Sequence, residues 1–228
     1  MSNIKKGEDA NYYEMTGRWP PHQLLTTDEK MFKKLGRDVK IYSNAVIPKP
    51  HLTEIGDSVI IDDFTLLVAG KSLKIGSFCH IAAFSSIKGS GDFTMGDFSS
   101  FSCGVRAYTS DDDYSKGEWM TNPTVPAQFR QRKDSFISIG NHVIIGTNTV
   151  ILPGAVINEG ASIGAGSVIK ANSILEGWTV YAGIPAKPIK KRPAARIKEL
   201  ERQLRETLYD RVGNYIPKNA RGPDWEPL

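Results

Sequence analysis

The chain has 228 residues, of which 40% are apolar and 24% charged, and its formal net charge is +4. This length and composition favour one main folded domain over a disordered chain. No apolar run approaches the roughly 18 residues that a membrane-spanning helix needs, and the first residues do not resemble a secretory signal. We therefore expect a cytoplasmic protein without a membrane span and without nucleic acid as a partner.

The first part of the chain, residues 1–34, is expected to be an arm that ends in a short helix. Thr27 is suited to cap that helix, which is expected over residues 27–35 and ends at Gly36. We expect this helix to close the upper end of the domain that follows.

Apolar residues recur in triplets at six-residue steps through the next part of the chain. Successive triplets begin at Leu35, Ile55, Ile75 and Met95, so each coil of three such units carries two extra residues. We expect these extra pairs to lie at one edge and to stack on one another. The repeated positions are Leu35, Ile41, Ile47, Ile55, Ile61, Leu67, Ile75, Ile81, Ile87, Met95, Phe101 and Ala107.

A polar excursion at residues 108–138 interrupts the repeat. It opens with the sequence YTSDDDY at 108–114, contains Pro123 and Pro126, and lacks the six-residue period. Loops longer than about 15 residues in a compact fold are usually functional or disordered. Because this excursion leaves a regular scaffold, we favour a functional role.

From Ile139 the repeat continues without a break. The apolar position returns at Ile139, Ile145, Ile151, Ile157, Ile163, Ile169, Leu175 and Tyr181. The fifth position of each unit is small or β-branched, at Val143, Thr149, Ala155, Ala161, Ser167, Ser173 and Thr179.

A period of six predicts short strands joined by tight turns. Six is a multiple of the two-residue strand period, so the apolar residue of every unit points to the same side, whereas a helical period would swing it around the axis. Three units form one triangular coil, and stacked coils bury the apolar positions in a column. The sequence therefore predicts an all-β fold, a parallel β-helix of about seven coils over residues 35–192. Cys79 and Cys103 lie inside the repeat and are expected to be buried free thiols.

The end of the chain, residues 193–228, predicts an α-helix followed by a tail. Between Ala194 and Asp210 an apolar stripe follows helical spacing. We expect this helix to cover the lower end of the column. The stripe consists of Ile197, Leu200, Leu204 and Leu208.

The repeat, the excursion after the fourth coil, GAGSV at 164–168 and YAGIPAK at 181–187 together resemble the hexapeptide-repeat acyltransferases. The similarity spans roughly residues 35–192 and is greatest to the branch with galactoside and maltose acetyltransferases and sugar acetyltransferases of bacterial polysaccharide synthesis. It implies a left-handed coil, a homotrimer and active sites between neighbouring subunits. Flat faces of a triangular prism suit threefold packing.

The resemblance also implies acetyl-CoA as co-substrate. Motif by motif, the family's CoA contacts fall on Thr147, Ala165, Lys170, Lys187 and Lys190, and Trp178 is a candidate for stacking on adenine. Backbone at glycine and alanine corners can bond the pantetheine amides, and lysines can pair with the phosphates. The alternatives are repeat architecture for the glycines and alanines, solvated charge for the lysines and a plain corner residue for Trp178.

Acyl transfer needs a group that removes a proton from the acceptor, and histidine suits this role. The family keeps that histidine in the excursion, but YTSDDDY at 108–114 contains none. His80 precedes the inward Ile81 and should point outward, so it is our first candidate for the general base. Asp112 and Asp113 are further catalytic candidates, and Asp111 and Tyr114 are candidate acceptor contacts. His22 and His51 are expected at the surface, and His142 in a turn.

We therefore predict an acetyltransferase for a small sugar acceptor, with N-acetylation of a nucleotide-linked amino sugar in surface polysaccharide (lipopolysaccharide) biosynthesis preferred. An amine acceptor is partly deprotonated at neutral pH, so it can react with a weaker general base than a hydroxyl acceptor needs. Sugar O-acetylation, acetylation of an antibiotic and a silent scaffold remain alternatives. A zinc enzyme resembling γ-class carbonic anhydrase would need three histidine ligands, so we expect no metal.

Overall fold

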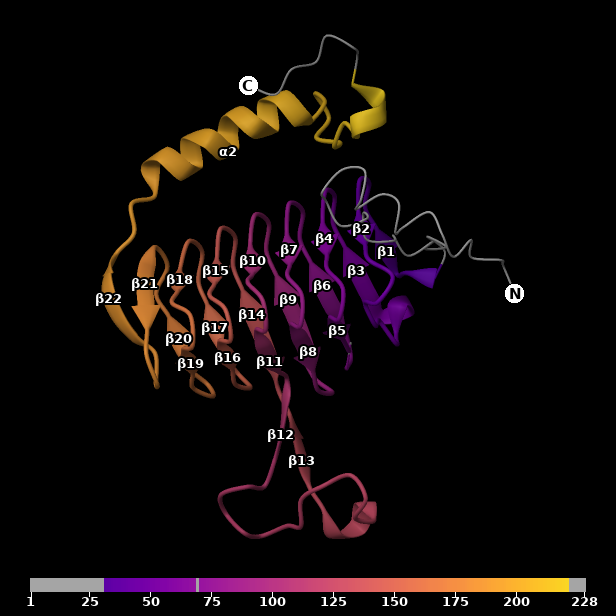
Figure 1. Cartoon of the computed structure of the whole chain (residues 1–228), viewed down its shortest axis with the longest axis vertical. Helices are drawn as coiled ribbons and strands as arrows, with labels where there is room; N and C mark the ends of the chain where they lie inside the picture. Colours follow the sequence, from indigo (N-terminus) through magenta and orange to yellow (C-terminus); the bar gives the residue numbers. More distant parts are fainter. Residues whose placement is uncertain (1–30, 69, 222–228) are drawn as a thin grey trace, which may run out of the picture.

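The structure of the chain is a computed structural model that describes residues 31–68 and 70–221. Short strands wind into a column of stacked coils, with helix α2 (Ala195–Leu208) along one side and a long hairpin projecting from the opposite side (Figure 1). The predicted fold class, a parallel β-helix of about seven coils, is confirmed. No described helix is both long and apolar enough to span a bilayer.

Three sheets form the faces of the column. The seven-stranded sheet contains, in spatial order, β1 (Lys34–Leu35), β3 (Thr53–Ile55), β6 (Leu73–Ile75), β9 (Asp92–Met95), β14 (Phe136–Ile139), β17 (Val156–Ile157) and β20 (Ile174–Leu175). The eight-stranded sheet contains β2 (Lys40–Ile41), β4 (Ile60–Ile61), β7 (His80–Ile81), β10 (Ser100–Phe101), β15 (Ile144–Ile145), β18 (Ser162–Ile163), β21 (Thr179–Ala182) and β22 (Lys187–Lys191). The five-stranded sheet contains β5 (Leu66–Leu67), β8 (Ser86–Lys88), β11 (Arg106–Tyr108), β16 (Val150–Ile151) and β19 (Val168–Ile169).

The interior of the column is the stack of repeated apolar positions. Every such residue from Ile139 to Tyr181 is buried, and so are the small residues at the fifth position, apart from the half-buried Ser173. Phe93 and Phe101 are among the largest fully buried side chains. Burial of this kind stabilises by roughly 25 cal/mol per Å² of apolar surface removed from water, which makes the column the main source of stability.

The early coils are longer than the later ones, as the spacing predicted. Leu67 pairs with Ile87 in the early part of the column, whereas Ile151 pairs with Ile169 in the later part, so an early coil is longer by two residues. The extra residues lie where the chain passes from the five-stranded to the seven-stranded sheet. A Cβ added to Gly70 would clash with the backbone of Ser90, so these segments stack closely.

The three edges of the column differ in what they carry. The helix edge joins the seven-stranded to the eight-stranded sheet and includes residues 76–79, 96–99, 140–143, 158–161 and 176–179. The open edge joins the eight-stranded to the five-stranded sheet and includes residues 62–65, 82–85, 102–105, 146–149 and 164–167. The arm edge joins the five-stranded to the seven-stranded sheet and includes residues 88–91, 152–155 and 170–173.

The excursion is a hairpin, called the arm below, that spans residues 109–135. Tyr108 still belongs to β11 and Phe136 begins β14, so the arm is shorter at both ends than expected. Its stem is an antiparallel pair, β12 (Ser110–Asp112) and β13 (Arg132–Asp134). Short 3₁₀ turns lie at Pro50–Leu52, Ala127–Phe129 and Lys218–Ala220.

Helix α2 is present where the sequence predicted it, but its position is different. It does not cover the lower end of the column, because β22 occupies that end by pairing antiparallel with β21. Instead α2 runs back along the helix edge toward the first coils (Figure 1). Lys198 pairs with Glu159 of a late coil, and Arg205 pairs with Asp97 of an earlier one.

A ladder of rings on the column underlies α2. Phe78 stacks on Phe98 and Phe98 on His142, with centroid distances of 5.0 and 4.9 Å. The Arg205 guanidinium lies 5.1 Å from the centre of the Phe98 ring, and Tyr209 contacts Phe78. Charged and aromatic side chains therefore make part of this contact. Of the predicted apolar stripe, Ile197, Leu204 and Leu208 are half-buried and Leu200 is 45% exposed.

Two expectations for single segments were wrong. Lys34 and Leu35 form β1 and do not end a helix, because pairing of Leu35 with Ile55 builds the first coil. Residues 27–30 of the predicted helix lie outside the described residues, as does His22. Both cysteines are free, but only Cys79 is buried; Cys103 is exposed because it occupies a turn position of the open edge.

Candidate active site

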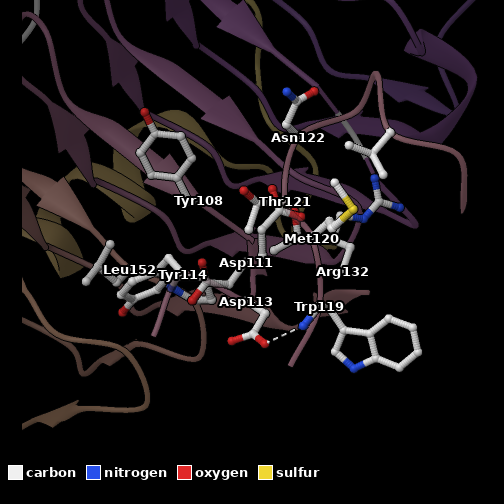
Figure 2. Close-up of a pocket in the computed structure, with 14 residues that line it drawn as sticks. Tyr108, Asp111, Asp113, Tyr114, Trp119, Met120, Thr121, Asn122, Arg132 and Leu152 are labelled. Atoms are coloured by element: carbon white, nitrogen blue, oxygen red, sulfur yellow. Dashed lines mark hydrogen bonds between the residues drawn. The ribbon is translucent and has the colours of Figure 1, made fainter. Parts of the chain in front are cut away.

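The arm brings the three predicted carboxylates together at its stem. Asp111 faces Lys133 and Asp112 faces Arg132 across the β12–β13 ladder. Together with Tyr114 and neighbouring side chains they line an open pocket of about 1040 Å³ between the arm and the column (Figure 2). The other residues lining it are Tyr108, Ser110, Asp113, Trp119, Met120, Thr121, Asn122, Val125, Arg132, Leu152 and Pro153.

The carboxylate of Asp113 is used by the arm itself. It accepts hydrogen bonds from the backbone amides of Lys116, Glu118 and Trp119 at 2.9, 2.7 and 3.1 Å. The amide of Trp119 pointing at this carboxylate is visible in Figure 2. These bonds, led by that from Lys116, hold the pKa of Asp113 below its ordinary value. Asp113 is thus suited to fixing the turn and poorly suited to accepting a proton.

The other two carboxylates are available to a substrate. Within the described part of the chain neither Asp111 nor Asp112 has a side-chain hydrogen bond or ion pair. Asp112 is exposed and Asp111 half-buried, and Tyr114 is 74% exposed beside them. This part of the pocket can receive an ammonium or a sugar hydroxyl.

His80 points outward from β7 on the eight-stranded sheet, as its place before Ile81 predicted. Its Nε2 lies 3.0 Å from Oδ2 of Asp62, and the imidazole is 48% exposed. If Nε2 carries the proton shared with this carboxylate, Nδ1 is left as the acceptor. A carboxylate that orients a histidine in this way is typical of acid–base sites.

Asp62 is the residue that reasoning from the sequence missed. Ile60 is the strand partner of His80 in the preceding coil. Asp62 follows Ile60 by two positions and therefore lies diagonally beside His80. The period of the early coils contained that signal, because it already placed Ile60 and His80 next to each other.

One chain does not bring His80 and the arm carboxylates together. His80 lies on the eight-stranded face, whereas Asp112 extends from the arm edge, which is the edge opposite that face. A site that contains both groups therefore requires two chains.

The remaining histidines have other environments. His142 is buried, and its Nε2 lies 2.7 Å from Oε2 of Glu201, so it is a link between column and α2. His51 is exposed on a 3₁₀ turn, as expected.

The predicted donor contacts are divided among the edges. Thr147 and Ala165 are stacked on the open edge, where the Gly166 amide donates to the Thr147 carbonyl at 2.8 Å. Lys187 and Lys190 are exposed on β22, at the lower end of the eight-stranded sheet. Lys170 lies on the arm edge.

Trp178 lies on the helix edge beneath α2. Arg192 and Lys198 lie 5.7 and 5.5 Å from its ring centre, and a Cβ on Gly160 would clash with the ring. The Trp178 ring is therefore packed by contacts within the chain, which do not depend on adenine.

Residues 136–171 match the family described as "Bacterial transferase hexapeptide (six repeats)". The Escherichia coli dTDP-4-amino-4,6-dideoxy-D-glucose acyltransferase is 41% identical over 174 residues, which cover 76% of this chain and 88% of the relative.

The fold is similar to crystal structures of AntD, an N-acyltransferase from Bacillus cereus. AntD with dTDP and 3-hydroxybutyryl-CoA has a TM-score of 0.75 and 34% identity, covering 82% of this chain and 98% of AntD. A point variant of AntD with dTDP-4-amino-4,6-dideoxyglucose and coenzyme A has a TM-score of 0.73 and 32% identity, covering 82% and 99%.

The chain belongs to the hexapeptide-repeat acyltransferases, the family of the Escherichia coli enzyme. The prediction of an acyl-CoA-dependent acyltransferase is thereby confirmed.

Proposed function

We propose that the protein transfers an acyl group from an acyl-CoA thioester to the amine of a dTDP-linked amino sugar. The acyl group that we propose is acetyl. The acceptor that the relatives favour is dTDP-4-amino-4,6-dideoxyglucose, on which the Escherichia coli relative acts and which the AntD variant binds. We place this reaction in the cytoplasm, as a step that supplies modified sugars for surface polysaccharide.

The working form is a homotrimer with active sites between subunits. The observation that carries this proposal is the separation of His80 from the arm: the two sets of groups lie on opposite sides of one column. In a trimer the arm of one chain reaches the eight-stranded face or the open edge of the next. The exposed side chains of Trp119, Met120 and Phe129 give the arm apolar surface for that contact.

In the reaction the amine nitrogen attacks the thioester carbonyl carbon, and the carbon–sulfur bond breaks as the tetrahedral intermediate collapses. The nitrogen loses one proton, and the departing thiolate gains one. Asp112 binds the ammonium form of the acceptor, which gives a first proton to solvent before the uncharged amine attacks. His80, oriented by Asp62, then accepts the proton that the attacking nitrogen loses and returns it to the departing thiolate. Asp111 and Tyr114 contact the sugar hydroxyls.

The donor lies along the open edge. Thr147 and Ala165 present backbone to the pantetheine amides, and the ammonium groups of Lys187 and Lys190 pair with the phosphates at the lower end. Lys170 of the neighbouring chain joins the same groove. Trp178 is not part of this proposal, because its ring is occupied beneath α2.

The test is thiol release from acetyl-CoA in the presence of single acceptors. Turnover is expected with dTDP-4-amino-4,6-dideoxyglucose and not with dTDP-glucose, which has hydroxyls alone. Activity only with hydroxyl acceptors would establish O-acylation, and activity only with antibiotics would establish the xenobiotic alternative. Either result contradicts the proposal. Failure of wild-type protein to bind coenzyme A in calorimetry would contradict acyl transfer altogether.

A further inference from the structure

The open edge carries an aromatic pair whose partner has not been accounted for. Phe64 and Phe84 stack with 5.3 Å between ring centroids and an interplanar angle of 8°. Their residue exposures are 58% and 62%. Both have positive φ, 60° and 62°, a conformation that is rare for a bulky residue. In the described chain each ring has only the other as a ring partner.

The helix edge carries a similar pair of stacked rings, and there another part of the chain covers them. There Phe78 and Phe98 occupy the equivalent turn positions, also with positive φ, and α2 covers them with Arg205 and Tyr209. The described part of the chain provides no cover of this kind for Phe64 and Phe84.

The next turn position below Phe84 carries no side chain. It is occupied by Gly104, whose amide donates to the Ala83 carbonyl at 2.9 Å and whose φ is +72°. Gly104 therefore contributes no side chain that would cover the second face of Phe84. The amide group of Asn148 borders the same space, since its Oδ1 is the atom nearest to where a Cβ on Gly104 would be.

The side chain of Arg106 supplies a positive charge beside Gly104. The guanidinium of Arg106 donates from one NH group to the carbonyl of Gly104 at 2.8 Å, and Arg106 is otherwise exposed. Guanidinium has five N–H donors, so several remain for a phosphate. A flat ring face, an amide with both a donor and an acceptor, and a guanidinium suit a base followed by phosphate.

We propose that Phe84, Asn148 and Arg106, with Phe64 behind Phe84, form the subsite for the nucleoside diphosphate part of the acceptor. This inference rests on the proposed function. The base stacks on Phe84 and its edge meets the Asn148 amide, while Arg106 binds the diphosphate.

The position of the subsite favours the acceptor over the nucleotide of coenzyme A. The subsite adjoins His80 and Asp62, since Asp62 is two residues before Phe64. In the acceptor only a diphosphate and one sugar separate the base from the amine. In acyl-CoA the whole pantetheine arm separates adenine from the thioester. A nucleotide base bound this close to His80 therefore belongs to the sugar substrate and not to acyl-CoA.

The test measures binding of dTDP and, separately, of coenzyme A to the full chain by calorimetry. Phe84→Ala is expected to weaken dTDP binding by roughly 10- to 100-fold, a typical loss for one stacked base. Arg106→Ala is expected to weaken it by a similar factor, because a charged hydrogen bond to phosphate is lost. Coenzyme A binding and the oligomeric state in sedimentation should stay unchanged. Phe136→Ala, which removes an exposed ring of β14, and Lys74→Ala, which removes an exposed charge, serve as matched controls.

Three results would overturn the assignment. Weaker coenzyme A binding with unchanged dTDP binding would place the donor nucleotide here. A smaller oligomer would make the aromatic pair a contact between copies of the chain. Unchanged binding of both dTDP and coenzyme A in both variants would show that neither nucleotide binds at these residues. Because dTDP binding needs no turnover, a wild-type protein that binds dTDP but acylates no amino sugar would contradict the proposed function and not the subsite.

Discussion

His142 Nε2 lies 2.7 Å from Oε2 of Glu201, and this contact joins a buried ring on the helix edge of the column to the helix that runs along it. Glu201 also receives a hydrogen bond from Arg205 at 2.7 Å. Burial alone would raise the pKa of Glu201, but the hydrogen bonds from His142 and Arg205 hold it below its ordinary value.

We therefore expect Glu201→Gln to loosen α2 by about 1–3 kcal/mol, the usual cost of leaving a charged hydrogen bond incomplete. Hydrogen exchange over residues 195–208 measures this. The stabilisation is present above the ordinary pKa of 4.5 and is lost as pH falls through the lower folded value. Glu206→Gln removes only an exposed pair with Arg202 and should leave hydrogen exchange over α2 nearly unchanged. Equal effects of the two variants would contradict a special role for Glu201.

The His80 side chain is expected to act in the chemical step. His80→Ala should lower kcat by about 10²- to 10⁴-fold while the KM for the acceptor changes little, and added imidazole should restore part of the rate. Asp62 acts as a positioning residue through His80. Asp62→Asn should therefore lower kcat less, without rescue by imidazole.

His51→Ala is the control, because His51 is likewise an exposed histidine but lies on a 3₁₀ turn. A kcat for His80→Ala equal to that of the control would remove His80 from the mechanism and leave Asp112 as the remaining candidate.

Neighbouring aspartates of the arm are expected to behave differently. Asp112→Asn should raise the acceptor KM or lower kcat by about tenfold or more, because its carboxylate is the one we expect to hold the ammonium. Asp113→Asn should act through the turn, seen as faster hydrogen exchange at Lys116, Glu118 and Trp119. Since the pKa of Asp113 is lowered, its contribution is fully present above the ordinary value of 3.8 and is lost as pH falls through the lower folded value. Steady-state kinetics of the pair distinguish the roles, and a larger kinetic effect of Asp113→Asn would reverse them.

The two cysteines should differ in reactivity. Burial raises the pKa of the Cys79 thiol to about 12, whereas Cys103 is exposed. Only the thiolate reacts with alkylating agents, so at pH 8 one thiol per native chain should be labelled, and two after unfolding. Peptide mapping should locate the native label on Cys103. Because Cys103 lies on the open edge beside the donor groove, saturating acyl-CoA is expected to slow its labelling. Rapid native labelling of Cys79 would show that the column opens there.

The six-residue period predicted the column because the strand period fixes which residues point inward. It also placed the two extra residues of the early coils at one edge, because the step from Leu67 to Ile75 is eight residues whereas the other steps of the coil are six. The path of α2 was not predictable in this way. Its direction depends on contacts such as that of Arg205 with Phe98, which link residues far apart in the sequence.

For the candidate site, alternation placed His80 on the outside of the column. It could not distinguish Asp112 from Asp113, because their difference arises from how the arm folds back onto one carboxylate. The surroundings of Trp178 were not predictable either, since nothing local in the sequence shows that Lys198 and Arg192 lie against its ring.

The arm leaves the column at the one edge where coils already differ in length, between Tyr108 and Phe136. The strands above and below remain in register across it, with Thr94 still paired to Ser138. Length changes there do not disturb the stacking of the other two edges. Exchange of the whole arm between related enzymes at these two points should consequently yield folded hybrids. In these hybrids the acceptor preference should change while the thermal stability of the column does not.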